Sequence, residues 1–220
     1  RQRMIKNKIA FISAIVILGI CMCLFFPYPN SEMIYAQSSF MSFPIQMKDG
    51  FRMLGIIGSI LFIFAIILLG RSITKYFFRT IGLVVILYAC LPYLLITAYQ
   101  ETFASGIMAM SYNGDGTCDF EMLGKDFMLG ECELALHNRS NEAVSFDLEF
   151  LESSYLADDM RMTTLMNIAG PYHFTIEANR IKSIHLKELL DVTNVPNHVE
   201  GGASFEVHFK LWDGDTERNL

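Results

Sequence analysis

The sequence has little charge, and its first half contains long stretches with none. Only 18% of the 220 residues are charged and 52% are hydrophobic, whereas a typical globular chain carries about 25% charged residues. Three stretches of the first hundred residues lack Asp, Glu, Lys and Arg altogether: 9–31, 53–70 and 80–100. This shortage of charge excludes a disordered tail, and it is atypical of a soluble domain.

Each uncharged stretch predicts a transmembrane helix, because about 20 apolar residues at 1.5 Å per residue cross a hydrocarbon core of about 30 Å. We expect spans at about 9–26, 53–70 and 81–99, within a helical membrane region over residues 1–99. A basic start followed by an apolar run also describes a secretory signal peptide. Cleavage after Ala36 would leave two spans, and the sequence leaves this alternative open.

The distribution of basic residues predicts the orientation. Residues 1–100 hold nine Lys and Arg against two Asp and Glu, and the basic residues gather before the first span and in the loop 71–80. Since basic loops stay on the cytoplasmic side, we expect an integral membrane protein with a cytoplasmic N-terminus. The loop 27–52 and residues 100–220 then lie outside.

The predicted spans lack ionisable residues, which transporters and intramembrane enzymes need at membrane depth. Their most distinctive feature is a small-residue face formed by Gly55, Gly58 and Ser59, which allows close helix packing. We expect this face to pack against the chain's own spans, with a partner's helix as the alternative.

Residues 100–220 predict an extracytoplasmic antiparallel β-sandwich of immunoglobulin-like type. Apolar and polar residues alternate most clearly over 144–150 and 205–211, as in strands with one buried face. A hairpin turn is predicted at 138–142. Residues 151–166 and 187–192 fit either short helices or loops. A third apolar set occurs over 132–136, and weaker strand patterns occur at 118–122, 172–178 and 181–186.

Two local features of this domain are candidate modification sites. Disulfides persist outside the cytoplasm, so we expect Cys118 and Cys132 to pair, with two reduced buried thiols as the alternative. A bridge would close a loop of about 14 residues. Asn138 begins an Asn-Arg-Ser sequon at the predicted turn, which we expect to be exposed. It would be a glycosylation site if the protein passes through a eukaryotic secretory route.

Motifs for catalysis and cofactor binding are missing. The five histidines form no His-x-x-x-His pair, the five cysteines form no Cys-x-x-Cys pair, and there is no Gly-x-Ser-x-Gly turn or phosphate-binding loop. We therefore expect no enzyme, no metal and no cofactor. The residues after position 100 carry 21 Asp and Glu against eight Lys and Arg, and this acidic balance disfavours nucleic acid.

These observations favour a non-catalytic membrane protein. It would present an acidic β-sandwich to a membrane or extracytoplasmic protein partner, as an accessory or assembly subunit of a membrane complex. Two alternatives remain: a ligand- or peptide-sensing receptor subunit, and an auxiliary subunit of a transport complex.

Overall fold

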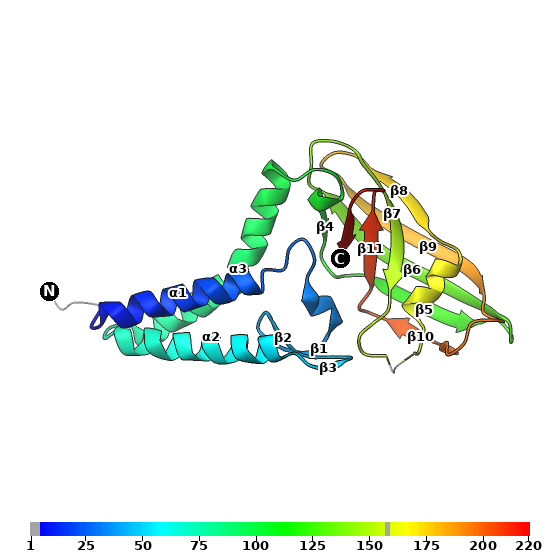
Figure 1. Cartoon of the computed structure of the whole chain (residues 1–220). Helices are drawn as coiled ribbons and strands as arrows, with labels where there is room; N and C mark the ends of the chain where they lie inside the picture. The colour runs from blue at the N-terminus through cyan, green and yellow to red at the C-terminus, as the bar shows by residue number, and fades with distance from the viewer. Residues whose placement is uncertain (1–4, 157–158) are drawn as a thin grey trace. The chain divides into compact units, whose positions relative to one another are not determined.

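The computed structural model describes residues 5–156 and 159–220, and the chain divides into two compact units (Figure 1). The first, here the helical unit, comprises Arg1–Tyr28 and Tyr35–Ile96. The second, here the β unit, comprises Pro29–Ile34 and Thr97–Leu220. A short piece of the loop after the first helix therefore belongs to the β unit.

Three apolar helices dominate the first part of the chain: α1 Lys8–Leu24, α2 Met53–Ser72 and α3 Phe77–Thr102. By length and composition α2 and α3 could cross a membrane, whereas α1, with 17 residues, is shorter. The Asn7 side chain caps α1 by accepting a hydrogen bond from the amide of Ala10 at 3.1 Å, which satisfies one of the free donors at the helix start.

The observed helix ends differ from the predicted spans. Helix α1 ends two residues earlier than expected, at Leu24, whereas α3 extends beyond the uncharged stretch at both ends and includes Arg79 and Glu101. The physical reason is that loss of charge marks the part of a helix that suits hydrocarbon. Arg and Glu are themselves good helix formers, so they do not end a helix.

The loop predicted over 27–52 contains a small antiparallel sheet that the sequence analysis missed. Its strands are β1 Ala36–Phe40, β2 Phe43–Met47 and β3 Gly50–Phe51, in the order β1-β2-β3. Phe43 is fully buried in the core of the helical unit. Its ring lies 4.9 Å from that of Phe25 and 5.8 Å from that of Phe62, measured between centroids.

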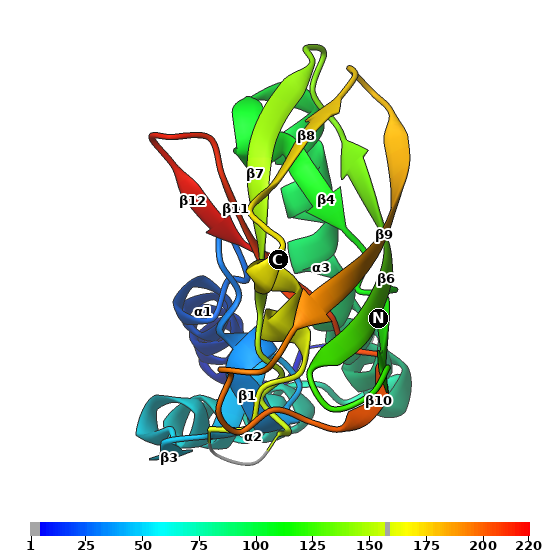
Figure 2. The ribbon, with the colours of Figure 1, turned by 90° about the vertical axis from the view of Figure 1, so that its right-hand side faces the viewer.

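The β unit contains two antiparallel sheets (Figure 2). In the five-stranded sheet, β6 is central. It pairs with the whole length of β9, and it also pairs with β5 and with the short β4. Strand β5 in turn pairs with β10. The other sheet has the order β12-β11-β7-β8. The strands are β4 Met110–Tyr112, β5 Thr117–Met122, β6 Phe127–Asn138, β7 Val144–Leu151, β8 Tyr172–Ile176, β9 Ile181–Asp191, β10 Gly201–Ser204, β11 His208–Trp212 and β12 Glu217–Asn219.

One hydrophobic core lies between these sheets. Alternate residues of β6 and β7 are buried, as the period-two pattern predicted. The core takes side chains from both sheets and from the 3₁₀ helix η3, Thr163–Ile168. Its largest fully buried members include Met128, Leu134, Leu136, Phe146, Leu148, Phe150, Leu165 and Phe209.

The strand predicted over 205–211 is wrong at its start. Residues 201–204 form β10 in the five-stranded sheet and residues 208–212 form β11 in the four-stranded sheet, so the chain changes sheets between them. Phe205 lies in the connection and is 73% exposed. An alternating pattern identifies the face of each residue, but it does not show that the chain leaves one sheet for the other.

Two further local predictions are wrong. Residues 187–191 continue β9 and form no helix, because pairing with β6 extends over the whole strand. The turn at 138–142 is no hairpin, since β6 and β7 belong to different sheets. The β8–β9 connection also passes between the two sheets.

Candidate functional site

Cys118 and Cys132 form a disulfide. They occupy directly opposite positions on the neighbouring strands β5 and β6, where their Cα atoms lie 4.1 Å apart. Both residues are fully buried and belong to the core of the β unit. The bond is compatible with the pairing predicted from the sequence, and it fixes the register of two strands within one sheet.

The small residues of α2 pack within the helical unit. Gly55, Gly58 and Ser59 are all buried, and the Ser59 hydroxyl donates to the Gly55 carbonyl at 2.8 Å. A Cβ on Gly55 would lie 1.7 Å from the carbonyl oxygen of Pro44, on β2. The closest neighbour of Gly55 is therefore backbone of the small sheet, where the sequence analysis expected another span.

Gly58 meets aromatic side chains. An added Cβ would approach the rings of Phe25 and Phe43 to 2.6 and 2.9 Å. Phe25 is the C-terminal cap of α1 and Phe43 begins β2. The small-residue face thus lets α2 approach both of these elements closely.

Asn138 is fully buried, so the prediction that the sequon asparagine is exposed is wrong. Its amide nitrogen donates to the carbonyls of Glu142, Ile176 and Glu177 at 2.7 to 3.2 Å. Its oxygen accepts from both the amide and the hydroxyl of Ser140. One side chain thereby joins the β6–β7 connection to the end of β8, and its amide nitrogen is not available at the surface.

Sequence reasoning missed a buried cation in the β unit. The Arg218 side chain, on β12, is 4% exposed, and it donates to four backbone carbonyls: those of Pro29, Ile107, Met108 and Met110. Gln100, near the end of α3, donates to two of the same carbonyls, Met108 and Met110. Arg218 is one of eight basic residues after position 100, and nothing in the surrounding sequence indicates that its side chain is buried.

This network holds the connection between α3 and the first strand of the β unit. Glu101 adds an ion pair with Arg139 at 2.8 Å. Arg218 and Gln100 together supply hydrogen-bond donors to these carbonyls, and a buried backbone carbonyl left unpaired costs about 1–3 kcal/mol.

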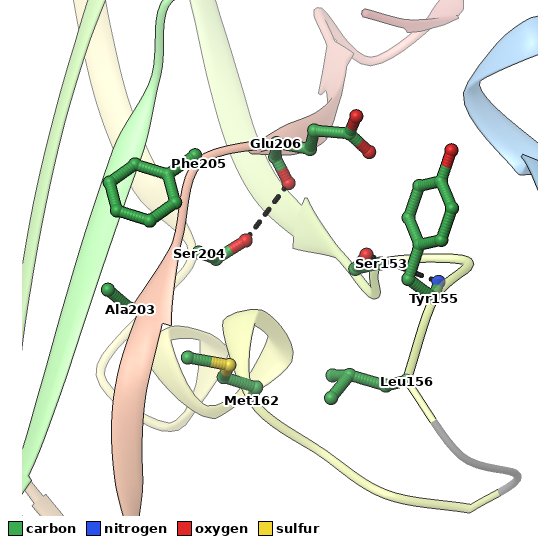
Figure 3. Close-up of a pocket in the computed structure, with 8 residues that line it drawn as sticks. All are labelled: Ser153, Tyr155, Leu156, Met162, Ala203, Ser204, Phe205 and Glu206. Carbon is green, nitrogen blue, oxygen red and sulfur yellow. Dashed lines mark hydrogen bonds between the residues drawn. The ribbon is translucent and has the colours of Figure 1, made fainter.

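An apolar pocket of about 280 Å³ opens beside β10 (Figure 3). Tyr155 and Leu156 lie on one side of it, Ala203 and Phe205 on the other, and Met162 between them. Ser153, Ser204 and Glu206 complete its lining. Tyr155 and Phe205 are 62% and 73% exposed, so two large aromatic side chains stand at the surface next to an apolar hollow.

The exposed face of the five-stranded sheet carries a charged cluster. The carboxylate of Glu131 accepts from Lys187 at 2.8 Å and pairs with the ring nitrogen Nε2 of His185 at 2.7 Å. These hydrogen bonds, that of Lys187 foremost, lower the pKa of Glu131 below its ordinary value. The side chains of the cluster are about 40–60% exposed, so it has little effect on stability.

No group of three or more His, Cys, Asp or Glu side chains within residues 5–156 and 159–220 could hold a metal ion. No family model matches the chain, and searches of curated proteins and of solved structures also gave no match.

Proposed function

We propose that this chain is a non-catalytic integral membrane protein whose β unit binds a protein partner, as an accessory or assembly subunit of a membrane complex. The observation that carries the proposal is the apolar pocket flanked by exposed Tyr155 and Phe205. Aromatic anchors beside an apolar hollow are typical of the residues that dominate protein interfaces. The surplus of acidic residues after position 100 favours a basic partner.

The membrane anchor is proposed to consist of three spans, α1, α2 and α3. All three helices are apolar, and α2 exposes large side chains such as Ile57, Ile60 and Ile63, each about half exposed. In water such a surface would be unfavourable, whereas lipid would cover it. Arg71, Lys75 and Arg79, at the adjoining ends of α2 and α3 and in the connection between them, support a cytoplasmic N-terminus and an outer β unit.

The β unit is proposed to be an immunoglobulin-like sandwich. Two antiparallel sheets around one core support this assignment. The disulfide is a departure, because Cys118 and Cys132 lie in the same sheet, whereas the bridge of antibody domains joins the two sheets. The proposed likeness therefore concerns the arrangement of layers.

Chemical crosslinking in the native membrane, followed by affinity purification of the full chain, tests the interface. We expect a crosslinked partner that is lost in Phe205→Ala and retained in Phe127→Ala. Phe127 is a matched control, since it is an exposed aromatic residue of the β unit at 45% exposure outside the pocket. Equal capture by both variants would contradict the pocket as the contact surface.

The orientation needs its own experiment. A single cysteine introduced at exposed Lys125, in a chain whose exposed Cys23 and Cys90 are replaced by alanine, would be labelled by a membrane-impermeant maleimide on intact cells. Labelling only after cell lysis would place the β unit in the cytoplasm and refute the proposed topology.

A receptor for a small ligand or peptide is the second candidate, and the pocket favours it. Its volume of about 280 Å³ is near the lower end of small-molecule sites. A ligand that binds only the folded state raises thermal stability with the logarithm of its concentration relative to Kd. A concentration-dependent rise in the melting temperature of the full chain, absent in Phe205→Ala, would favour this candidate over a protein partner.

A further inference from the structure

The strand β9 is a long edge of the five-stranded sheet. Its eleven residues pair with β6 in an unbroken register, and with no other strand in the part of the chain that the structure describes. The other edge strands are β4, β8, β10 and β12, with three, five, four and three residues. Proteins usually shorten, bend or interrupt such edges, because a long regular edge is a template for another strand.

Two backbone hydrogen bonds define which side of β9 is free. The amide of Asn138 donates to the carbonyl of Arg180, and the amide of Val192 donates to the carbonyl of Asp126, both at 2.9 Å. Antiparallel pairs alternate between hydrogen-bonded and non-hydrogen-bonded positions. The even-numbered residues from 180 to 192 therefore bond to β6, and the odd-numbered residues from 181 to 191 direct their N–H and C=O groups to the outside.

We propose that two copies of this chain associate through β9, antiparallel, around a twofold axis at His185, so that the two five-stranded sheets become continuous. This register pairs odd positions with odd positions, as hydrogen bonding at the free edge requires. This dimer is separate from the proposed function, since β9 and the pocket beside β10 lie at different edges of the sheet.

The side chains of β9 are complementary to one another in this register. Lys182 lies opposite the partner's Glu188, and Ile184 lies opposite the partner's Leu186. Both are non-hydrogen-bonded pairs, in which Cα atoms approach to about 4.5 Å and side chains interact most closely. On the outer face, Ile181 lies opposite the partner's Leu189. By symmetry each of these pairs occurs twice.

The registers with the axis two residues away on either side are less favourable. A twofold axis at Lys187 would place this lysine directly opposite its own copy, and like charges directly opposite each other are destabilising. An axis at Ser183 would place Glu188 opposite the partner's Ala178, so that the charged pair is lost. The charge pattern of the strand therefore favours a centre at His185 over these two registers.

Charge reversal in the full chain in mild detergent tests the pairing. Lys182→Glu and Glu188→Lys each replace two attractive pairs by two repulsive ones, so we expect the dimer Kd to rise at least about tenfold. The double variant restores opposite charges and should return to within about threefold of the wild type. Lys125→Glu is the matched control, because it makes the same charge change at an exposed turn.

The double variant matters because Lys182 also donates to the carbonyl of Thr175 and lies over the ring of Phe174. Reversal of Lys182 alone removes these contacts, and the double variant does not restore them. Rescue therefore reports the intermolecular pair. A monomeric wild type at tens of micromolar, or a double variant as weak as the single variants, would overturn the proposal.

A crosslinking experiment in the native membrane tests the register directly. His185→Cys places two thiols opposite each other at the twofold axis, at a Cα separation of about 5.5 Å that a disulfide can bridge. Mild oxidation should yield a disulfide-linked dimer for His185→Cys and none for Ser145→Cys, an exposed position on the other sheet. Equal yields at both positions would refute pairing through β9. Loss of the dimer with retained partner capture would separate this failure from failure of the proposed function.

Discussion

Replacement of Asn138 by alanine should destabilise the β unit strongly. The side chain is fully buried, its amide nitrogen donates to three carbonyls, and its oxygen accepts from two groups of Ser140. Truncation leaves carbonyls at the β6–β7 connection and at the end of β8 without donors. Since each buried unpaired polar group costs about 1–3 kcal/mol, we expect a loss of roughly 2–4 kcal/mol in the free energy of unfolding.

The assay is thermal unfolding of the full chain in detergent, monitored through tryptophan fluorescence. Trp212, the only tryptophan in the sequence, lies on β11 and so reports on the β unit alone. For a domain of this size, a loss of 2–4 kcal/mol lowers the melting temperature by roughly 10 °C. Asn138→Asp should be worse than alanine, because it turns a carboxylate oxygen toward three carbonyl oxygens.

Asn141→Ala is the control, since Asn141 is an exposed asparagine of the same connection, and its side-chain oxygen accepts a hydrogen bond from the exposed Asn179. Exposed substitutions usually change stability by less than about 0.5 kcal/mol. If Asn138→Ala and Asn141→Ala unfolded at the same temperature, the structural role assigned to Asn138 would be refuted.

Three further predictions use the same fluorescence signal or limited proteolysis. Reduction of the Cys118–Cys132 bond should cost the β unit roughly 3 kcal/mol, the value for a loop of about 15 residues, and an unchanged melting temperature would contradict this. Gly55→Ala should expose the loop 27–52 to protease, because its Cβ would clash with backbone, whereas Gly82→Ala, with open space at its Cβ, should not. Burial lowers the pKa of His208, so in the unfolded chain this histidine binds a proton first as the pH falls. The contribution of neutral His208 to the free energy of unfolding is therefore fully present above about pH 6.5 and is lost as the pH falls below it. His208→Gln should flatten the dependence of stability on pH in this range.

The sequence alone predicted the apolar helices and the antiparallel β domain. Charge and hydropathy are local properties, so the uncharged stretches around α2 and α3 and the alternation along β7 can be identified from a few consecutive residues. The opposite positions of Cys118 and Cys132 also follow from local pattern, because a short turn-rich segment joins their two strands.

Only the tertiary structure decided which segments meet. The burial of Asn138 depends on carbonyls about 38 residues away, and that of Arg218 depends on carbonyls more than 100 residues away. Likewise, the passage of the chain from β10 to β11 and the free edge of β9 follow from the choice of sheet partners. The physical reason is that the period of a strand specifies which side chains are buried, whereas the partner of each strand depends on long-range packing in the shared core.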